Sequence, residues 1–512
     1  MKRQRGVAII IVLAVLVAGV SFLLLRSFNA AAWPAHRHDV TKQALVMAKE
    51  ALVARAVADD NRPGSLPCPD TDDDGDAELF AGNECPSYIG RLPWRTLGLP
   101  DLRDGNSERL WYVLSRNFRD HPSAEPVNSN TLATLSVTGT EPAGNVMAVL
   151  VAPGAPIRRA GAPALQDRSC TVGVDCDANR VCTTAPAWNT PKCNAVNYLD
   201  ASGASPDEVV TAAIGDAFND RVLAVLHDEV LPLVEKRATL ELAQNLRSHF
   251  DAWAGAPAVA ATKGFYPYAA TFNDPQSASP GVIGTRDGLL PMDASSVVWT
   301  SASATLGACA GVGTTTITCT VPLFALGLLT INGRVGSIAT AFIDPPTGAE
   351  ATVQSGVVLG GGTTTWTLDA ANERLNFTYS GNVIGLLTTV RVQAPQPSAW
   401  TTNSWLVNNA WHSVSYFALA SEYSLAGAGA CAGLCIMAQN TALPNDNKQA
   451  VVLTTGRALA GAATDQTPRL VTPPPANRAH YLELQNQTTA DRTFERATRG
   501  AAFNDQIAIV RP

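Results

Sequence analysis

The sequence predicts an α+β protein: an N-terminal transmembrane helix leading into two tandem copies of a long helix plus an antiparallel sheet. Three observations support this prediction. The run 6–25 is apolar and carries no charge. Short motifs recur in the same order in the two halves of the chain. A block rich in threonine and valine, 295–399, interrupts the second copy and predicts an all-β insertion.

The run 6–25 is long enough to cross a bilayer. At about 1.5 Å per residue, a helix over it spans about 28 Å, close to the thickness of the hydrocarbon core. Three basic residues precede the run and only Arg26 follows closely, so the positive-inside rule puts the N-terminus in the cytoplasm and the rest of the chain outside. The alternative is a secretory signal peptide cleaved near 30–32, which the length of the run disfavours.

The short basic leader ends in Gly6, directly before the apolar run. This arrangement resembles the class III signal of type IV pilins and type II secretion pseudopilins. The resemblance implies that prepilin peptidase cleaves after Gly6 and that the new N-terminal residue, Val7, is methylated. It also implies an inner-membrane location and contacts with other pilins or pseudopilins through the N-terminal helix.

The chain departs from this family at Ile11, the fifth residue after the expected cleavage. Most members carry glutamate there, and its carboxylate pairs with the N-terminal amine of a neighbouring subunit. Ile11 cannot make that bond. A minor pseudopilin that sits at the filament tip lacks the glutamate as well, so the resemblance implies a place at or near the tip.

A second resemblance covers residues 1–230. The motifs RPGSLPCPD (62–70), GRLPWRTLGLPDLRD (90–104) and ERLWYVLS (108–115) are similar to those of large pilin-like proteins with prepilin leaders. Strands are expected over 110–114 and 145–152. A helix followed by a turn-rich loop and an antiparallel sheet is the order of a pilin head.

The segment 41–58 predicts a helix that is apolar on two flanks. Leu45 and Leu52 lie on one flank, and Val46 and Val53 lie on the other. We expect one flank to pack on the head and the other on neighbouring subunits; an ordinary core helix is the alternative. Pro34, upstream, is expected to kink or break the helix.

Internal repeats predict that the head is duplicated. Several short segments recur in order at similar spacing, and the helix expected over 228–253 would begin the second copy. The matched segments are 91–93 with 289–291, 111–114 with 416–419, 148–157 with 450–459, 197–200 with 480–483, and 217–225 with 502–510. The expected organisation is a leader 1–6, a transmembrane helix 7–26, a first pilin-like head 27–227, a second head 228–294 and 400–512, and a β-rich insertion 295–399.

Composition and charge fit an exported globular protein. Of the 512 residues, 46% are hydrophobic and 16% are charged. The four basic residues around the apolar run leave the exported part at −11, against −7 for the whole chain. This charge argues against nucleic acid or anionic lipid as the main partner.

The ten cysteines all follow the apolar run, in an expected oxidising compartment, and predict disulfides. The natural local pairs are Cys68–Cys85, Cys309–Cys319 and Cys431–Cys435. Four further cysteines allow three pairings: Cys170, Cys176, Cys182 and Cys193. Their spacing does not fit the paired cysteines of a zinc site.

An acidic loop predicts a calcium site. Carboxylates occur at positions 1, 3, 5, 7 and 9 of an EF-hand-like pattern, with Gly75 at position 6. Position 12 is Ala81, so a closing ligand would come from elsewhere, with Glu84 as a candidate. The alternative is a solvated acidic loop. The expected ligands are Asp70, Asp72, Asp74, Asp76 and Glu78.

No catalytic motif is present. The chain lacks a nucleophile elbow, a zinc-protease helix motif, a phosphate loop and a dinucleotide fingerprint. His227, beside Asp228, is expected to make a helix-start contact, and the two Phe-Asn-Asp segments are expected to form turns. We therefore expect that the protein is not an enzyme. An exported hydrolase is an alternative, but no motif in the sequence supports it.

The sequence thus predicts a non-enzymatic minor pilin or pseudopilin of a type IV pilus or a type II secretion filament. It would be a single-pass inner-membrane protein, cytoplasmic at its N-terminus and periplasmic or extracellular beyond, with incorporation into a surface filament. The alternative is a membrane-anchored adhesin or substrate-binding protein that uses the insertion 295–399.

Overall fold

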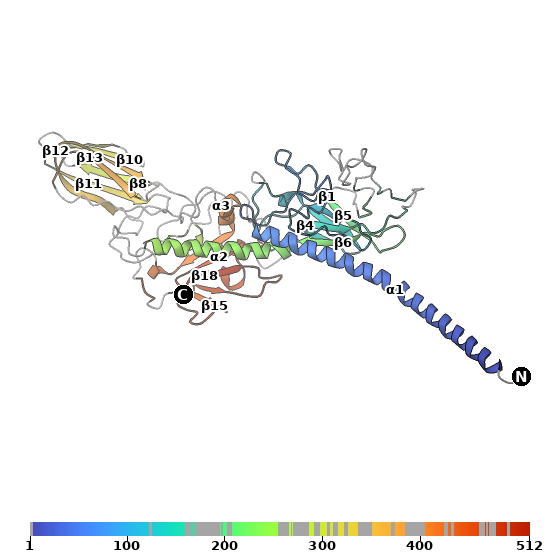
Figure 1. The fold of residues 1–512 in the computed structure, drawn as a ribbon. Helices are drawn as coiled ribbons and strands as arrows, with labels where there is room; N and C mark the ends of the chain where they lie inside the picture. The colour runs from blue at the N-terminus through green and yellow to red at the C-terminus, as the bar shows by residue number, and fades with distance from the viewer. Residues whose placement is uncertain are drawn as a thin grey trace. The chain divides into compact units, whose positions relative to one another are not determined.

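A computed structural model describes most of the chain (Figure 1). Side chains are described except in 4–9, 23–33, 249, 252–253 and the strands within 297–384. The description covers all residues apart from 1–3, 122–124, 159–164, 167, 169–194, 196–197, 202–206, 254–265, 268, 270–285, 291–296, 305–307, 311–315, 322–325, 336–350, 370–373, 385–404, 424–428, 432–434, 460–465, 467–468, 470–477 and 489–491.

The chain forms two compact units that combine helices with sheets. The first comprises Met1–Glu125 and Leu132–Val230, and the second comprises Pro126–Thr131 and Leu231–Pro512. The α+β class predicted from the sequence is therefore confirmed.

The first unit begins with one continuous helix, α1 (Gln4–Ala58). Of the kink or break expected at Pro34, the break is wrong, because α1 runs through this residue. Proline removes one helical hydrogen bond, but its fixed φ is close to that of a helix, so a long helix tolerates it. Among the described residues, no helix meets the length and apolarity needed to cross a membrane.

The C-terminal part of α1 buries one face. Leu45 is 6% exposed and Leu52 is fully buried, as are Ala48 and Ala56. On the other flank, Val46 remains 40% exposed. Within the unit the sheet therefore covers a single side of the helix, the flank expected to pack on the head, and the packing of the other flank on neighbouring subunits stays a prediction.

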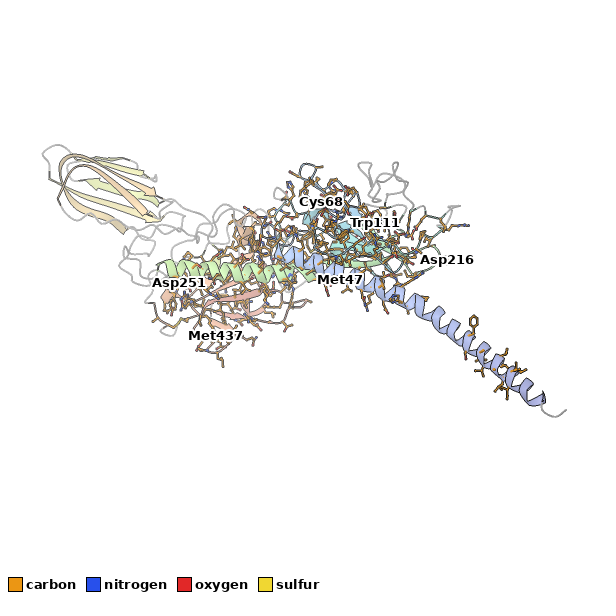
Figure 2. All side chains as sticks on the ribbon, viewed as in Figure 1. Met47, Cys68, Trp111, Asp216, Asp251 and Met437 are labelled. Carbon is orange, nitrogen blue, oxygen red and sulfur yellow. A yellow bond between two sulfur atoms is a disulfide. The ribbon has the colours of Figure 1, made fainter. Side chains whose placement is uncertain are left out.

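The sheet under α1 has six strands: β1 (Ile89–Arg91), β2 (Trp111–Leu114), β3 (Leu135–Gly139), β4 (Ala143–Ala152), β5 (Glu208–Thr211) and β6 (Arg221–Leu226). The order is β1-β2-β4-β3-β5, and β6 also pairs with β4. α1 packs on β4 and β6. Because both faces of β4 are covered, its last seven residues are all buried. Trp111 belongs to the apolar cluster of this sheet (Figure 2).

The second unit has its own long helix and sheet. α2 (His227–Trp253) matches the helix expected over 228–253. The sheet contains β7 (Asp287–Leu289), β14 (Ser415–Leu419), β16 (Ala450–Thr454) and β18 (Gln506–Arg511), in the order β18-β16-β14-β7. The short helix α3 (Trp405–Asn408) precedes β14, and β15 (Met437–Gln439) pairs in parallel with β17 (Thr493–Glu495).

The sheets of the two units share strand order and register. The hydrogen-bonded series β1-β2-β4-β6 of the first unit has its counterpart in β7-β14-β16-β18 of the second. Residues matched as short sequence motifs therefore hold equivalent positions. The corresponding pairs are Arg91–Trp111 with Leu289–Tyr416, Trp111–Val151 with Tyr416–Leu453, and Val151–Val222 with Leu453–Ile507.

The block between β7 and β14 forms a separate antiparallel sheet. Its strands are β8 (Val297–Ala304), β9 (Ala308–Ala310), β10 (Thr316–Val321), β11 (Leu326–Val335), β12 (Ala351–Asp369) and β13 (Arg374–Ile384). The order is β8-β11-β12-β10-β9, with β13 also on β12. The sequence predicts a small sandwich or curled sheet here, and the long strand β12 pairs with β11 along its first half and β10 along its second.

Two of the expected disulfides are confirmed. Cys68–Cys85 and Cys431–Cys435 are bonded, each with its Cα atoms 5.6 Å apart. Cys309 and Cys319 face each other in register between β9 and β10. Cys170, Cys176, Cys182 and Cys193 lie outside the described residues.

Acid is expected to destabilise the second unit through His412. Burial lowers the pKa of this histidine to about 4, and neither ring nitrogen has a hydrogen-bond partner among the described residues. Between about pH 6.5 and 4 the unfolded chain binds the proton and the folded chain does not, so stability falls as the pH falls. The expected loss is about 2–3 kcal/mol. Urea unfolding at pH 7 and pH 4.5 should show a smaller difference for His412→Phe than for the unaltered chain; equal differences would contradict the prediction.

Candidate metal centre

The acidic loop is anchored at both ends. The Cys68–Cys85 disulfide closes it. Asp70 exchanges two backbone hydrogen bonds with Arg91 of β1, at 3.0 and 2.6 Å. A Cβ on Gly90 would lie 2.4 Å from the Asp70 carbonyl oxygen, so glycine is required for this close approach. The first acid of the motif is therefore fixed against a strand.

The turn itself is built around the Asp70 carboxylate. Its oxygens accept the backbone N–H groups of Asp73 (2.6 Å) and Gly75 (2.8 Å). Gly75 has φ +94°, and a Cβ there would lie 2.5 Å from the Trp94 ring. Asp72 accepts the N–H of Asp74 at 3.2 Å. The sharp turn expected at Gly75 is therefore present.

Three carboxylates converge on the inside of this turn. One oxygen from each of Asp70, Asp72 and Glu78 lies within 4.8 Å of the others. The Glu78 carboxylate is held by the backbone N–H of Thr71 at 3.0 Å and by the Thr71 hydroxyl. Asp70 is buried at 1% exposure, and the other two are partly buried.

Two of the five expected ligands stay outside this cluster. Asp74 accepts the backbone N–H of Asp76 at 2.7 Å. The Asp76 side chain is 57% exposed and faces Arg95 at 3.7 Å. The alternate positions of an EF-hand-like loop therefore do not all converge in space, because Asp74 and Asp76 make other contacts.

Glu84 is not the closing ligand. Its carboxylate accepts the Tyr88 hydroxyl and pairs with Arg116 (3.1 Å) and Arg119 (3.4 Å). These contacts hold the pKa of Glu84 below its usual value, with the Tyr88 hydrogen bond as the main cause. Two arginines therefore neutralise this carboxylate away from the acidic cluster.

Sequence reasoning missed the separate role of Asp73. Its carboxylate lies 3.1 Å from Arg109 and 3.6 Å from Arg91. Arg109 also pairs with Asp101 at 2.9 Å. Both arginines are far from Asp73 in the sequence, and nothing in the local pattern distinguishes Asp73 from its acidic neighbours.

Burial and neighbouring carboxylates disfavour ionisation of the cluster in the absence of a cation. Burial, reinforced by the Asp73 carboxylate, raises the pKa of Asp70 to about 8. Burial and Asp74 raise the pKa of Asp72. The donor set consists of carboxylate oxygens, which are the hard ligands that Ca²⁺ and Mg²⁺ prefer. Asp70, Asp72 and Glu78 are therefore the residues that would hold a divalent cation here.

Calcium is expected to stabilise the protein through this loop. Ca²⁺ at about 100 times its dissociation constant should add about 2.7 kcal/mol to the free energy of unfolding. Gly75→Ala should abolish this gain, because its Cβ collides with Trp94. Gly82→Ala is the matched control: Gly82 also has a positive φ, but open space surrounds its Cβ. Thermal unfolding with Ca²⁺ and with a chelator measures the gain, and a chain that does not respond to Ca²⁺ would contradict the prediction.

The residues considered for catalysis have structural contacts. His227 begins α2, is 1% exposed, and has its Nδ1 3.1 Å from the Asp228 carboxylate. Asn219 donates to the Ala155 carbonyl and Asn504 to the Arg457 carbonyl, both at 2.6 Å. The helix-start and turn contacts expected for these segments are confirmed.

A buried polar cluster, which the sequence analysis missed, occurs in both units. In the first, Arg168 donates to the carbonyl oxygens of Gly154 (2.5 Å) and Tyr198 (3.1 Å), and Gln166 donates to Asp200 (3.0 Å). In the second, the same contacts recur with Arg469, Gly456, Tyr481, Gln466 and Glu483. We name these the arginine clamps. One residue separates Gln166 from Arg168 in the first unit, but two separate Gln466 from Arg469 in the second. This difference in spacing is why the sequence comparison did not pair the two segments.

An aspartate closes each clamp. Asp220 accepts the backbone N–H of Asp200 at 2.6 Å, and Asp505 accepts that of Glu483 at 3.1 Å. Burial raises the pKa of Asp220 to about 7 and the pKa of Asp505 well above its ordinary value. These are the aspartates of the two Phe-Asn-Asp segments, so each segment ties a turn to a clamp.

No protein-family model, curated protein or solved structure matches this chain.

Proposed function

We propose that the chain is a non-enzymatic minor pilin-like or pseudopilin-like subunit, anchored in the inner membrane by α1 and assembled into a type IV pilus or a type II secretion filament. Prepilin peptidase would cleave after Gly6, and Val7 would be methylated. Other pilins or pseudopilins would contact the N-terminal part of α1. The two sheet-bearing units would be tandem pilin-like heads outside the cytoplasm.

The observation that carries the proposal is the division of α1 into two parts. Over 44–56 its buried face packs on the sheet. Over 10–22, by contrast, every large apolar side chain is exposed; Ile10 is 69% and Phe22 is 60% exposed. Figure 2 shows the side chains of this distal part away from the sheet of the first unit. Exposed apolar surface of this extent is unfavourable in water, and lipid or neighbouring apolar helices would cover it.

The shared register of the two sheets supports a duplicated head. Equivalent strand order could arise separately, but equivalent residue pairing and two equivalent arginine clamps require agreement at many positions. Each sheet also follows a long helix in the chain, α1 for the first and α2 for the second. α2 carries charged residues along its length and would not enter a membrane.

Ile11 supports a place at or near the filament tip. Its side chain is 58% exposed and apolar, so its insertion into the bilayer carries no free-energy penalty. It also offers no carboxylate to the N-terminal amine of a subunit ahead of it. A tip subunit has no subunit ahead of it. Calcium bound by Asp70, Asp72 and Glu78 would stiffen the loop of the first head.

Mass spectrometry of the N-terminus tests the proposal. In cells with prepilin peptidase the chain should begin at a methylated Val7, and in cells without it the leader should remain. Gly6→Val should block processing, whereas Gly19→Val, in the same helix with open space around its Cβ, should not. A leader retained in both strains, or a start beyond Leu25, would refute the pilin-like assignment.

A second candidate function, adhesion or substrate recruitment by the insertion, is favoured by the register of its sheet. Because directly paired residues and alternate residues share a face, nine polar residues fall on one face: Thr316, Thr318, Thr320, Thr363, Thr365, Thr367, Asn376, Thr378 and Ser380. The opposite face has the apolar row Ile317, Trp366 and Phe377. The paired residues Asp369 and Arg374 continue this face at one end. A polar face of this size, on a sheet of its own, is suited to contact an external partner.

Deletion of 295–399 separates the two candidates. The deletion should leave the second unit folded, because the strands on either side of it, β7 and β14, are hydrogen-bonded to each other. In addition, the Leu290 N–H donates to the Ser415 carbonyl at 3.3 Å. Under the adhesion hypothesis the deletion abolishes surface or substrate binding and leaves filament assembly intact. Loss of assembly, with binding retained, would contradict it.

A further inference from the structure

Two buried carboxyl groups meet in the arginine clamp of the second unit. Glu483 is 3% exposed and Asp505 is 6% exposed. They are 22 residues apart in the sequence, and β18 begins directly after Asp505. The contact between these two side chains therefore ties the last strand of the chain to the clamp.

Donors from the protein occupy three of the four carboxyl oxygens. Asp505 Oδ2 accepts the backbone N–H of Glu483 at 3.1 Å and the side-chain amide of Asn486 at 3.0 Å. Glu483 Oε1 accepts the side-chain amide of Gln466 at 2.7 Å, and Oε2 accepts the backbone N–H of Asn504 at 3.0 Å. The fourth oxygen, Asp505 Oδ1, is buried and accepts no donor among the described residues.

The two carboxyl groups are hydrogen-bonded to each other. Ionised carboxylates can only accept hydrogen bonds, so a bond between two of them requires a proton on one. Asp505 Oδ1 is the oxygen that lacks a donor, and a proton on it can be donated to Glu483. One proton at this position therefore accounts for both the buried oxygen and the close approach of the two acids.

The charges around the pair favour the same arrangement. Arg499 pairs with Glu235 at 2.6 Å. Arg469 lies 3.8 Å from Glu483. Asp505 is thus a third carboxyl group beside two cations, and burial, reinforced by the Glu483 carboxylate, raises its pKa well above the ordinary value. The titratable and charged groups around Asp505 are Glu483, Arg469, Tyr481, Glu235 and Arg499.

We propose that Asp505 is protonated at neutral pH and donates a hydrogen bond to Glu483, and that this proton holds β18 to the arginine clamp until alkaline pH removes it. Without the proton, two carboxylates would be in contact away from water, where like charges repel strongly. Separation of the two segments relieves this repulsion, and the segment that ends at Asp505 continues into β18. The C-terminal strand of the second unit is therefore the part that responds to pH.

The first unit contains the same arrangement with a shorter side chain. Asp220 corresponds to Asp505 and accepts the backbone N–H groups of Asp200 (2.6 Å) and Ala201 (2.8 Å). Asp200, the counterpart of Glu483, is one methylene shorter and acts on Asp220 through its charge. Burial is the main cause that raises the pKa of Asp220 to about 7. The first unit therefore provides a comparison within the same chain.

Hydrogen exchange of the full chain, resolved by peptide and corrected for intrinsic exchange rates, tests the proposal. Between the ordinary pKa of unfolded Asp505 and its raised folded pKa, only the folded chain holds the proton, so stability falls as the pH rises. One such proton lowers the folding equilibrium constant about tenfold per pH unit. From about pH 5.5 to 7.5, protection of β16 and β18 should fall about 100-fold more in the unaltered chain than in Asp505→Asn, whose amide donates to Glu483 at every pH.

Asp220→Asn is the matched control. It should change the pH dependence of protection in β4 and β6 and leave that of β16 and β18 as in the unaltered chain. Asp505→Ala separates the proton from the other contacts of the side chain. It removes the acceptor for Glu483 and Asn486, so it should lower the protection of β18 at both pH values, whereas Asp505→Asn should retain it at pH 5.5.

Infrared difference spectra give a direct measure of the proton. The unaltered chain minus Asp505→Asn should show the C=O stretch of one protonated carboxyl group at neutral pH. The absence of this band, or equal pH dependence of exchange in the two chains, would overturn the proposal. Asp505→Asn as damaging as Asp505→Ala at pH 5.5 would overturn it as well, because Asp505 would then be ionised in the folded chain.

Discussion

Replacing Arg469 by methionine is expected to lower the free energy of unfolding of the second unit by about 3–5 kcal/mol. Arg469 is 2% exposed and donates to the carbonyl oxygens of His480 (3.0 Å) and Tyr481 (3.2 Å) and to the Thr455 hydroxyl (2.9 Å). Methionine fills a similar volume but removes these donated hydrogen bonds, and it takes away the positive charge 3.8 Å from the buried Glu483 carboxylate. Urea unfolding of the full chain measures the loss.

The duplicated clamp provides an internal comparison. Arg168→Met should destabilise the first unit in the same way, because it removes the donor to the Gly154 and Tyr198 carbonyls. Lys236→Met, on the exposed face of α2, is the control and should change stability by less than about 0.5 kcal/mol. A loss below about 1 kcal/mol for Arg469→Met would show that the clamp contributes no more than an exposed contact.

Truncating Leu52 to alanine is expected to cost the first unit about 2–5 kcal/mol. Leu52 is fully buried between α1 and the sheet, so its removal leaves a cavity at the contact that joins the helix to the head. Val46→Ala, on the opposite flank and 40% exposed, should cost less than about 1 kcal/mol in the isolated chain. Thermal unfolding of both variants measures the difference.

The same pair of variants distinguishes the head contact from a filament contact. If α1 packs on neighbouring subunits as proposed, Val46→Ala should weaken filament assembly while leaving the stability of the isolated chain unchanged. Equal thermal destabilisation by both substitutions would mean that α1 packs on two sides within the unit, which the exposure of Val46 contradicts.

Local patterns in the sequence were sufficient for many features. Hydrophobic runs and helix formers predicted α2 and the strands β2 and β4 within a few residues. Short spacing predicted the Cys68–Cys85 and Cys431–Cys435 bonds, since closing a small loop requires little rearrangement. The ordered repeats predicted which residues would hold equivalent positions in the two sheets, including Trp111 and Tyr416.

The acidic loop shows where local pattern fails. Alternating carboxylates predicted five ligands, but only Asp70, Asp72 and Glu78 converge. Asp73 is drawn to Arg91 and Arg109, and Glu84 to Arg116 and Arg119. Each of these arginines lies outside the acidic run in the sequence and is brought to it by the fold, so no spacing within the loop could identify the diverted carboxylates.

The sequence by itself determined the apolar N-terminal run, the repeated segments and the strand-forming insertion, because each depends on residues that are neighbours in the chain. Only the tertiary structure decided that α1 buries a single face, that Pro34 leaves it unbroken, and that an arginine clamp recurs in both units. Those outcomes depend on which distant groups a folded backbone brings within hydrogen-bonding distance, and a carboxylate or guanidinium takes the partner that folding places beside it.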